Sequence, residues 1–158
     1  MTKAFKRNYN RIVREIETDV SIKPPLFLGG GNELPWVNVK GIWDTGATRT
    51  AITNKIVQLL GLKPTGKATV FGVNSQAIVN RYLVDIKLPD EIVFHNFEVL
   101  ESKLNSPGID ILVGMDIIQQ GDFAISNANG KTTFSFCIPP LKSPVDLLER
   151  SKESISSP

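Results

Sequence analysis

Apolar and polar residues alternate along several short stretches of the chain. The clearest stretch spans residues 14–22, where Ile16, Thr18, Val20 and Ile22 alternate with acidic residues and a serine. A period of two is typical of a β-strand with one buried face. Further runs of aliphatic and aromatic residues predict strands over residues 37–43, 69–71, 77–88, 92–100, 109–113, 123–126 and 131–138.

Two segments follow a helical period instead. Apolar residues recur at helical spacing from Ile52 to Leu60, with Thr53 suited to the N-cap and Gly61 to the C-terminal stop. A second short helix is expected over residues 115–120. The chain is therefore predicted to be mainly β, with one or two short helices.

The composition changes along the chain and predicts three parts. Residues 1–14 are basic and polar, so we expect a flexible N-terminal arm. Residues 15–140 contain the predicted strands and helices and form the expected folded domain. Residues 141–158 are rich in serine, proline and charged residues, which predicts a polar C-terminal tail, mobile from residue 151 onwards.

Size and charge exclude several classes of protein. The chain has 158 residues, of which 41% are hydrophobic, and this suffices for one domain with a substantial core. The net charge of +2 argues against nucleic acid or an anionic membrane as a partner. No apolar run approaches the roughly 18 residues of a membrane span. The first twenty residues lack the apolar segment of a secretory signal, so we expect a cytoplasmic protein.

The chain has one cysteine, Cys137, and one histidine, His95. A single cysteine excludes an internal disulfide and a cysteine-rich metal site. His95 has no second histidine and no cysteine beside it with which to share a metal ion. We therefore expect neither a metal nor a cofactor.

The candidate chemistry lies in Asp44-Thr45-Gly46, at the end of an apolar strand. Two interpretations are open. In the first, Asp44 caps its own backbone in an Asx-type turn and Gly46 supplies a positive φ. In the second, the carboxylate has a chemical purpose, because Ile42 and Trp43 give it an apolar setting and burial of an unpaired charge is costly.

A second motif, Leu112-Val113-Gly114, also follows a strand and precedes a predicted helix. The chain thus has, in order, Asp44-Thr45-Gly46-Ala47, a helix ending at Leu60-Gly61-Leu62, a hairpin tip at Gly72 and this second motif. The order resembles that of the retropepsins, the single-domain aspartic proteases of retroviruses, retrotransposons and their bacterial and eukaryotic relatives. The similarity covers about residues 35–139, and Gly114-Met115-Asp116-Ile117 is closer to the bacterial and cellular branch.

The resemblance implies a closed retropepsin-like fold and a role for each matching residue. Asp44 would be catalytic: two Asp44 carboxylates, one from each protomer of a homodimer, would activate water to hydrolyse a peptide or protein substrate. Active-site support would come from Thr45, which would hydrogen-bond across the dimer, and from Gly46, Ala47 and Gly114. The flap that binds substrate would comprise Phe71, Gly72, Val73 and Asn74.

The chain also departs from the viral retropepsins. Thr48-Arg49 replaces the acidic pair often found after the motif, and the predicted flap has one glycine where viral flaps have several. Arg49 has two interpretations: a positive charge at the mouth of the cleft, which would favour acidic substrates, or a solvated surface arginine.

Three functions therefore remain open. The intact Asp-Thr-Gly-Ala motif favours an aspartic endopeptidase. The alternatives are a catalytically silent dimer that binds an extended peptide or protein partner by strand addition, and a processing domain excised from a longer polyprotein. In a dimer, we expect at least one of two segments, residues 15–22 and 134–138, to pair across the two-fold axis.

Overall fold

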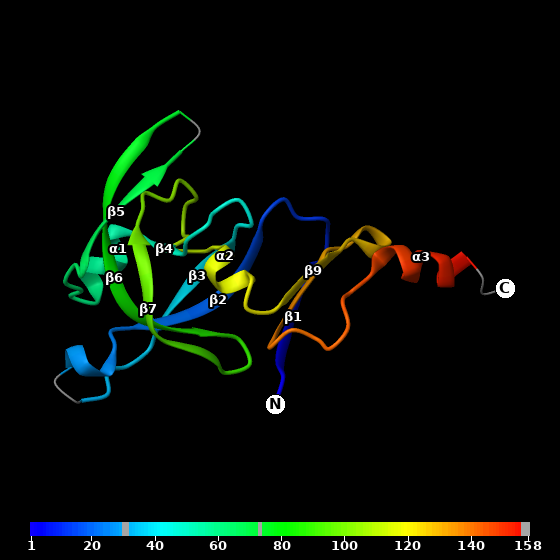
Figure 1. Cartoon of the computed structure of the whole chain (residues 1–158), viewed down its shortest axis with the longest axis horizontal. Coiled ribbons are helices and arrows are strands. Elements are labelled where there is room, and N and C mark those ends of the chain that lie inside the picture. The colour runs from blue at the N-terminus through cyan, green and yellow to red at the C-terminus, as the bar shows by residue number, and fades with distance from the viewer. Residues whose placement is uncertain (30–31, 73, 156–158) are drawn as a thin grey trace.

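A closed β-sheet contains most of the strands of the molecule (Figure 1). The computed structural model describes residues 1–29, 32–72 and 74–155. Within them, one seven-stranded sheet has the order β2-β3-β8-β4-β7-β6-β5, and an additional pairing of β2 with β6 closes it. Its strands are β2 (Ile16–Lys23), β3 (Val37–Trp43), β4 (Ala51–Ile52), β5 (Gly66–Phe71), β6 (Gln76–Leu88), β7 (Ile92–Glu101) and β8 (Ile111–Val113).

The alternation in β2 has the physical basis expected from the sequence. Ile16, Val20 and Ile22 are buried on the inner face, whereas Glu17 and Asp19 are exposed on the outer face. Thr18 is also buried, and its hydroxyl accepts a hydrogen bond from the indole N–H of Trp43 at 2.9 Å. A polar residue is tolerated there because its oxygen has a partner. The prediction of a mainly β fold is confirmed.

A second sheet has the order β1-β10-β9 and packs against the end of β3. It consists of β1 (Lys3–Asn8), β9 (Asp122–Ser126) and β10 (Thr133–Ile138). Aromatic rings join the two sheets: Trp43 lies 4.8 Å from Phe134 and 5.2 Å from Phe136, measured between ring centroids. Phe134 and Phe136 are almost completely buried.

The first residues of the chain are not the flexible arm that their polar composition predicted. They form β1, which pairs antiparallel with β10 from Lys3 opposite Ile138 to Asn8 opposite Thr133. The Phe5 ring lies 6.0 Å from Trp43 and 5.7 Å from Phe134. Pairing with a distant strand and one half-buried aromatic ring, Phe5, therefore order a segment whose local sequence is polar.

The described residues contain three α-helices, one more than the upper limit predicted. They are α1 (Asn54–Leu59), α2 (Met115–Ile118) and α3 (Leu147–Ile155), and two short 3-10 helices cover Leu26–Gly29 and Ala128–Gly130. As predicted, Thr53 is the N-cap of α1 and Gly61 follows it with φ of +61°. The Thr53 hydroxyl, however, donates to Asp110 Oδ1 rather than capping the helix.

The predicted polar tail contains α3, which extends away from the two sheets in Figure 1. Asp146, the residue before α3, caps its N-terminus. Its Oδ1 accepts hydrogen bonds from the backbone N–H groups of Leu148 at 2.8 Å and Glu149 at 3.1 Å. Residues 156–158, the end of the tail expected to be mobile, lie outside the described residues. None of the helices in the described part of the chain is long and apolar enough to cross a membrane.

We predict that Phe5→Ala lowers the free energy of unfolding by about 2 kcal/mol, less than the loss at a fully buried phenylalanine because Phe5 is only half-buried. Urea unfolding followed by tryptophan fluorescence measures the change, since Trp43 contacts Phe5. Ile12→Ala, at an exposed position, is the control. Equal stability of the two variants would mean that β1 does not anchor the sheet.

Candidate active site

Asp44 follows β3 directly, at the point where β3 and β8 end side by side. The two strands are parallel, with Trp43 opposite Val113. The backbone N–H of Asp44 donates to the carbonyl of Val113 at 3.0 Å, so the pairing continues into the motif. Asp44 itself is half-buried. The backbone that carries the Asp44 carboxylate is therefore held at the end of a strand pair in the closed sheet.

The turn 44–47 has the hydrogen bonds of an Asx-type turn. Gly46 N–H donates to Asp44 Oδ1 at 2.8 Å, and Ala47 N–H donates to the carbonyl of Asp44 at 3.3 Å. Gly46, however, does not have the positive φ expected of it. The backbone thus orients one carboxylate oxygen, and no described residue donates a hydrogen bond to the other oxygen, Oδ2. Such a turn is compatible with a catalytic carboxylate.

Thr45 and Gly46 are exposed, and Ala47 is half-buried. No hydrogen bond joins the Thr45 hydroxyl to another residue in the described part of the chain. The structure therefore brings Asp44, Thr45, Gly46 and Ala47 together in one turn whose outer face is open. Their roles in catalysis remain predictions.

Gly114 lies against the backbone of the same loop. A Cβ atom at Gly114 would be 2.6 Å from the carbonyl carbon of Arg49 and 3.0 Å from the carbonyl oxygen of Ala47. The next residue, Met115, donates its N–H to the carbonyl of Ala47 at 2.8 Å. Helix α2 therefore begins in contact with the Asp44 loop, and a residue with a side chain does not fit at position 114.

Two polar residues of this contact were not predicted from the sequence. Thr50 is completely buried, and its hydroxyl accepts a hydrogen bond from Gly114 N–H at 3.1 Å and donates one to Asp116 Oδ1 at 2.6 Å. Asp116 also accepts from Thr50 N–H, at 2.9 Å to Oδ2, and from Ile117 N–H at 3.0 Å. An acidic residue in the first turn of a predicted helix was the available signal for Asp116. Its partner Thr50 had no local signal.

The predicted flap is the hairpin formed by β5 and β6, which projects from the sheet in Figure 1. Gly72 N–H donates to the carbonyl of Ser75 at 2.7 Å and closes the tip. Phe71, Gly72 and Asn74 are exposed, whereas Val73 lies outside the described residues. No hydrogen bond between described residues joins this tip to the Asp44 turn.

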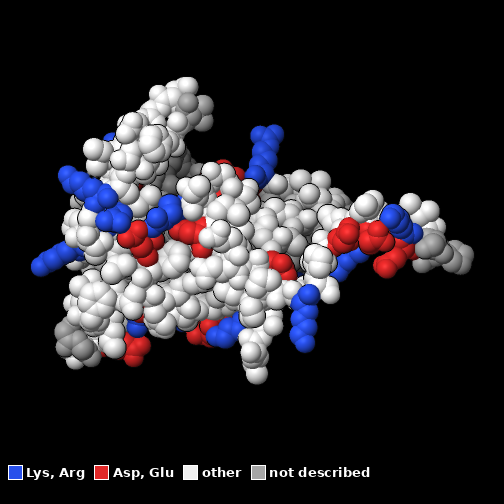
Figure 2. Space-filling view, viewed as in Figure 1, with Lys and Arg blue, Asp and Glu red and all other residues white. Residues whose placement is uncertain are grey.

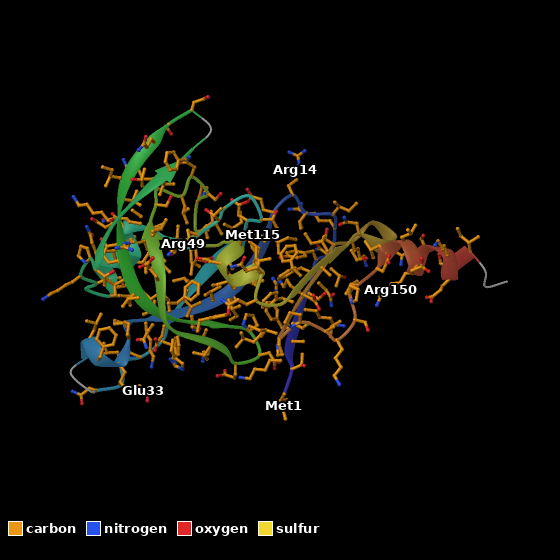
Figure 3. The ribbon with its side chains drawn as sticks, in the orientation of Figure 1. Met1, Arg14, Glu33, Arg49, Met115 and Arg150 are labelled. Carbon is orange, nitrogen blue, oxygen red and sulfur yellow. The ribbon has the colours of Figure 1, made fainter. Side chains whose placement is uncertain are left out.

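Arg49 lies at the surface, as the second interpretation expected, but it is paired with carboxylates. Its position is labelled in Figure 3. The Arg49 guanidinium is paired with Glu98, and its Nε lies 3.5 Å from Asp116 Oδ2. The side chain is 43% exposed. Because Arg49 is paired with two carboxylates, it is a surface arginine whose charge is not free at the mouth of the cleft.

A second group of hydrogen-bonded polar side chains surrounds Glu101, the last residue of β7. Glu101 accepts hydrogen bonds from Asn54 at 2.8 Å, from Tyr82 at 2.9 Å and from Asn80 at 3.2 Å. The bond from Asn54 is the main reason that the pKa of Glu101 is lowered, and burial is the main reason that the pKa of Tyr82 is raised. This network connects the start of α1 to β6 and β7.

His95 and Cys137, the other titratable residues considered from the sequence, lie outside the Asp44 turn. His95 Nδ1 lies 3.1 Å from Asp85 Oδ2, and Cys137 is a half-buried free cysteine. Among the described residues, no group of three or more His, Cys, Asp or Glu side chains could hold a metal ion.

We predict that Gly114→Ala lowers the free energy of unfolding by about 1–3 kcal/mol, because the new methyl group would overlap the backbone of Arg49 and Ala47. Gly61→Ala is the matched control. Gly61 has φ of +61° and open space around it, so this variant tests conformation without overlap, at about 1 kcal/mol. Thermal and urea unfolding of both variants measure the difference; a smaller loss for Gly114→Ala would contradict the close contact.

The chain was compared with known proteins by sequence and by structure. The sequence profile of the family described as Aspartyl protease matches residues 30–117, which include Asp44 and Gly114. A search of curated protein sequences gave no match.

Several solved structures resemble the chain. The retropepsin-like aspartic protease from Rickettsia conorii has a TM-score of 0.53 at 16% identity, over 87% of this chain and 96% of that one. The EIAV protease complexed with the inhibitor HBY-793 has a TM-score of 0.48 at 21% identity, over 70% and 90%. The simian foamy virus (mac) protease has a TM-score of 0.44 at 18% identity, over 66% and 92%.

The profile match spans more than half of the chain, and the Rickettsia structure has the same fold at low identity. The chain therefore belongs to the aspartyl protease family, and its fold is that of the retropepsin-like aspartic proteases.

Proposed function

We propose that this protein is an aspartic endopeptidase that hydrolyses peptide bonds in peptides or proteins as a homodimer. The observation that carries the proposal is the state of Asp44. Gly46 N–H orients one carboxylate oxygen at 2.8 Å, while the other oxygen has no hydrogen-bond donor among the described residues. A carboxylate held in this way can accept a proton from a water molecule.

The chemistry requires two carboxylates. Hydrolysis of an amide without a metal or a covalent nucleophile needs a base for the attacking water and an acid to polarise the scissile carbonyl. Two carboxylates about 3 Å apart share one proton, so one is the base and the other the acid. The sequence has a single Asp-Thr-Gly motif, so the second carboxylate comes from Asp44 of an identical partner.

Two surfaces support the dimer. Thr45 is exposed next to Asp44, and its hydroxyl is available to donate to a partner. In the second sheet, β1 and β9 lie at the edges, whereas β2 pairs with β3 on one side and β6 on the other. Of the two segments expected at the two-fold axis, residues 134–138 lie in β10, the central strand of this sheet, and are paired within the chain with β1 and β9. In the other segment, residues 15–22, only residues 21 and 22 pair with β6, so this segment and the edge strands β1 and β9 are the better candidates.

The β5–β6 hairpin supports a role in substrate binding. Phe71 is 76% exposed and Ile78 70% exposed, on strands that pair Val70 with Ala77 and Thr69 with Ile78. Exposed apolar side chains on a projecting hairpin suit contact with the side chains of an extended peptide. Closure of the hairpin over the peptide would exclude bulk water from the carboxylates, apart from the water molecule that they activate.

We predict that Asp44→Asn reduces peptide hydrolysis by at least about 10²-fold, because the amide cannot act as the base or share the proton. Cleavage of an unstructured protein substrate by wild type and variant is compared, with circular dichroism to establish that the fold is retained. Asp19→Asn, which removes an exposed carboxylate from β2, is the control.

The rate should depend on pH as a bell-shaped curve with its maximum below neutrality, since one carboxylate must be protonated and one ionised. Metal chelators should have no effect. Equal cleavage by wild type and Asp44→Asn would overturn the proposed enzyme. A dimer that binds extended peptides without cleaving them would support the catalytically silent alternative instead.

Dimerisation must precede turnover if each protomer supplies half of the site. We predict that Thr45→Val weakens the dimer, because the partner's acceptor loses its donor at a cost of roughly 1–3 kcal/mol per buried group. With two such losses per symmetric dimer, the dissociation constant rises by about 1.5 to 4 orders of magnitude.

Sedimentation and activity are measured together across a dilution series. Activity of Thr45→Val should recover in part at high protein concentration, and Thr45→Ser should resemble wild type because it retains the hydroxyl. A monomer with full activity would refute the half-site arrangement.

A further inference from the structure

Four charged side chains form a continuous chain of ion pairs across the face below the flap. Arg49 pairs with Asp116, its Nε 3.5 Å from Oδ2, and with Oε1 of Glu98. The other oxygen of Glu98, Oε2, lies 3.3 Å from a guanidinium nitrogen of Arg81. In Figure 2, blue and red groups adjoin one another on this face. Arg49 follows the Asp44 turn, and Arg81 is in β6, so the cluster joins the active turn to the flap strand.

Arg81 lies at the root of the flap. In the pairing of β5 with β6 it is opposite Gly66, the first residue of β5. Its guanidinium packs over the backbone of this glycine, where an added Cβ would be 2.5 Å from a guanidinium nitrogen. The Arg81 carbonyl accepts a hydrogen bond from Thr65 N–H at 2.8 Å. Both the side chain and the backbone of Arg81 thus contact the strand that begins the flap.

The other end of the cluster is attached to the active turn. Thr50, next to Arg49, is buried and bonded to Asp116 through its hydroxyl, while its carbonyl accepts from Leu100 N–H at 3.0 Å. Arg49 therefore extends from a fixed backbone toward Glu98. Glu98 in β7 is diagonal to Arg81 across the β6–β7 pairing, since Arg81 is opposite Leu100.

We infer that Glu98 is a positioning residue that fixes the root of the flap relative to the Asp44 turn. The inference rests on the proposed peptidase function. Each oxygen of Glu98 contacts a different arginine, so one carboxylate holds two cations that would otherwise repel each other. A fixed root reduces the conformational freedom that the flap loses when it closes on a peptide, which favours substrate binding.

The exposure of the cluster determines how it responds to salt. The side chains of Glu98, Arg81 and Arg49 are 32%, 36% and 43% exposed. Pairs exposed to this degree are screened by added electrolyte, since the Debye length falls from about 10 Å at 0.1 M to about 3 Å at 1 M. The contribution of Glu98 should therefore be largest at low ionic strength.

The test compares Glu98→Gln with Glu91→Gln in the full-length protein. Glutamine keeps the shape of Glu98 but removes its charge. Glu91 is in an exposed pair with Lys87 at the β6–β7 turn, so its variant has the same change of net charge without touching the cluster. Two quantities are measured: hydrogen exchange of the amides of residues 66–72 and 76–81 without substrate, and KM and kcat for a peptide at low and high salt.

For Glu98→Gln at low salt we expect flap exchange to be about 3–10-fold faster and KM about 3–10-fold higher, with kcat within about 2-fold of wild type. At about 1 M salt the differences should largely disappear. Arg49→Gln should have the same effects, and the double variant should be no worse than either single variant, because each change breaks the same link.

Flap exchange and KM of Glu98→Gln equal to those of Glu91→Gln would overturn the inference. A kcat loss with unchanged KM and unchanged exchange would also overturn it. Faster exchange in Glu98→Gln, in a protein whose wild type has no Asp44-dependent cleavage, would overturn the proposed function and support the link between the turn and the flap root.

Discussion

The close contact between Gly114 and the Asp44 loop is the constraint on which the rest of the site depends. Parallel pairing of β3 with β8 brings residue 113 beside residue 43, and the chain then passes directly against the backbone of residues 47–49. The hydrogen bonds that follow use backbone N–H groups: Asp44 to Val113, and Met115 to Ala47. Because these hydrogen bonds join backbone groups, they hold the turn in position independently of its side chains.

The closed sheet and the aromatic cluster hold that strand pair in place. Trp43, the residue before Asp44, is buried among rings from the second sheet, and its indole N–H is bonded to Thr18 in β2. The carboxylate therefore follows an anchored side chain. Phe5, at the start of the chain, contributes to the same cluster, so the N-terminal strand helps to support a residue that is distant in sequence.

Charge near the active turn is balanced within the protein. Arg49 stands where an acidic pair often follows the motif in viral retropepsins, and two carboxylates, Glu98 and Asp116, neutralise it. These carboxylates come from β7 and α2, so the two ion pairs connect two separate elements to the turn. A positive residue beside the motif therefore acts on the protein's own structure and is not available as a free charge for substrate recognition.

The sequence by itself determined the features that have a local signal. A period of two predicted β2, helical spacing predicted α1 between Thr53 and Gly61, and the Asp44 and Gly114 motifs predicted the two segments that meet at the site. Only the tertiary structure decided that residues 3–8 form a strand, that Thr50 binds Asp116 and that Arg49 binds Glu98. The physical reason is that these interactions join residues far apart in the chain, and a hydrogen bond or ion pair between distant segments leaves no periodic pattern in either one.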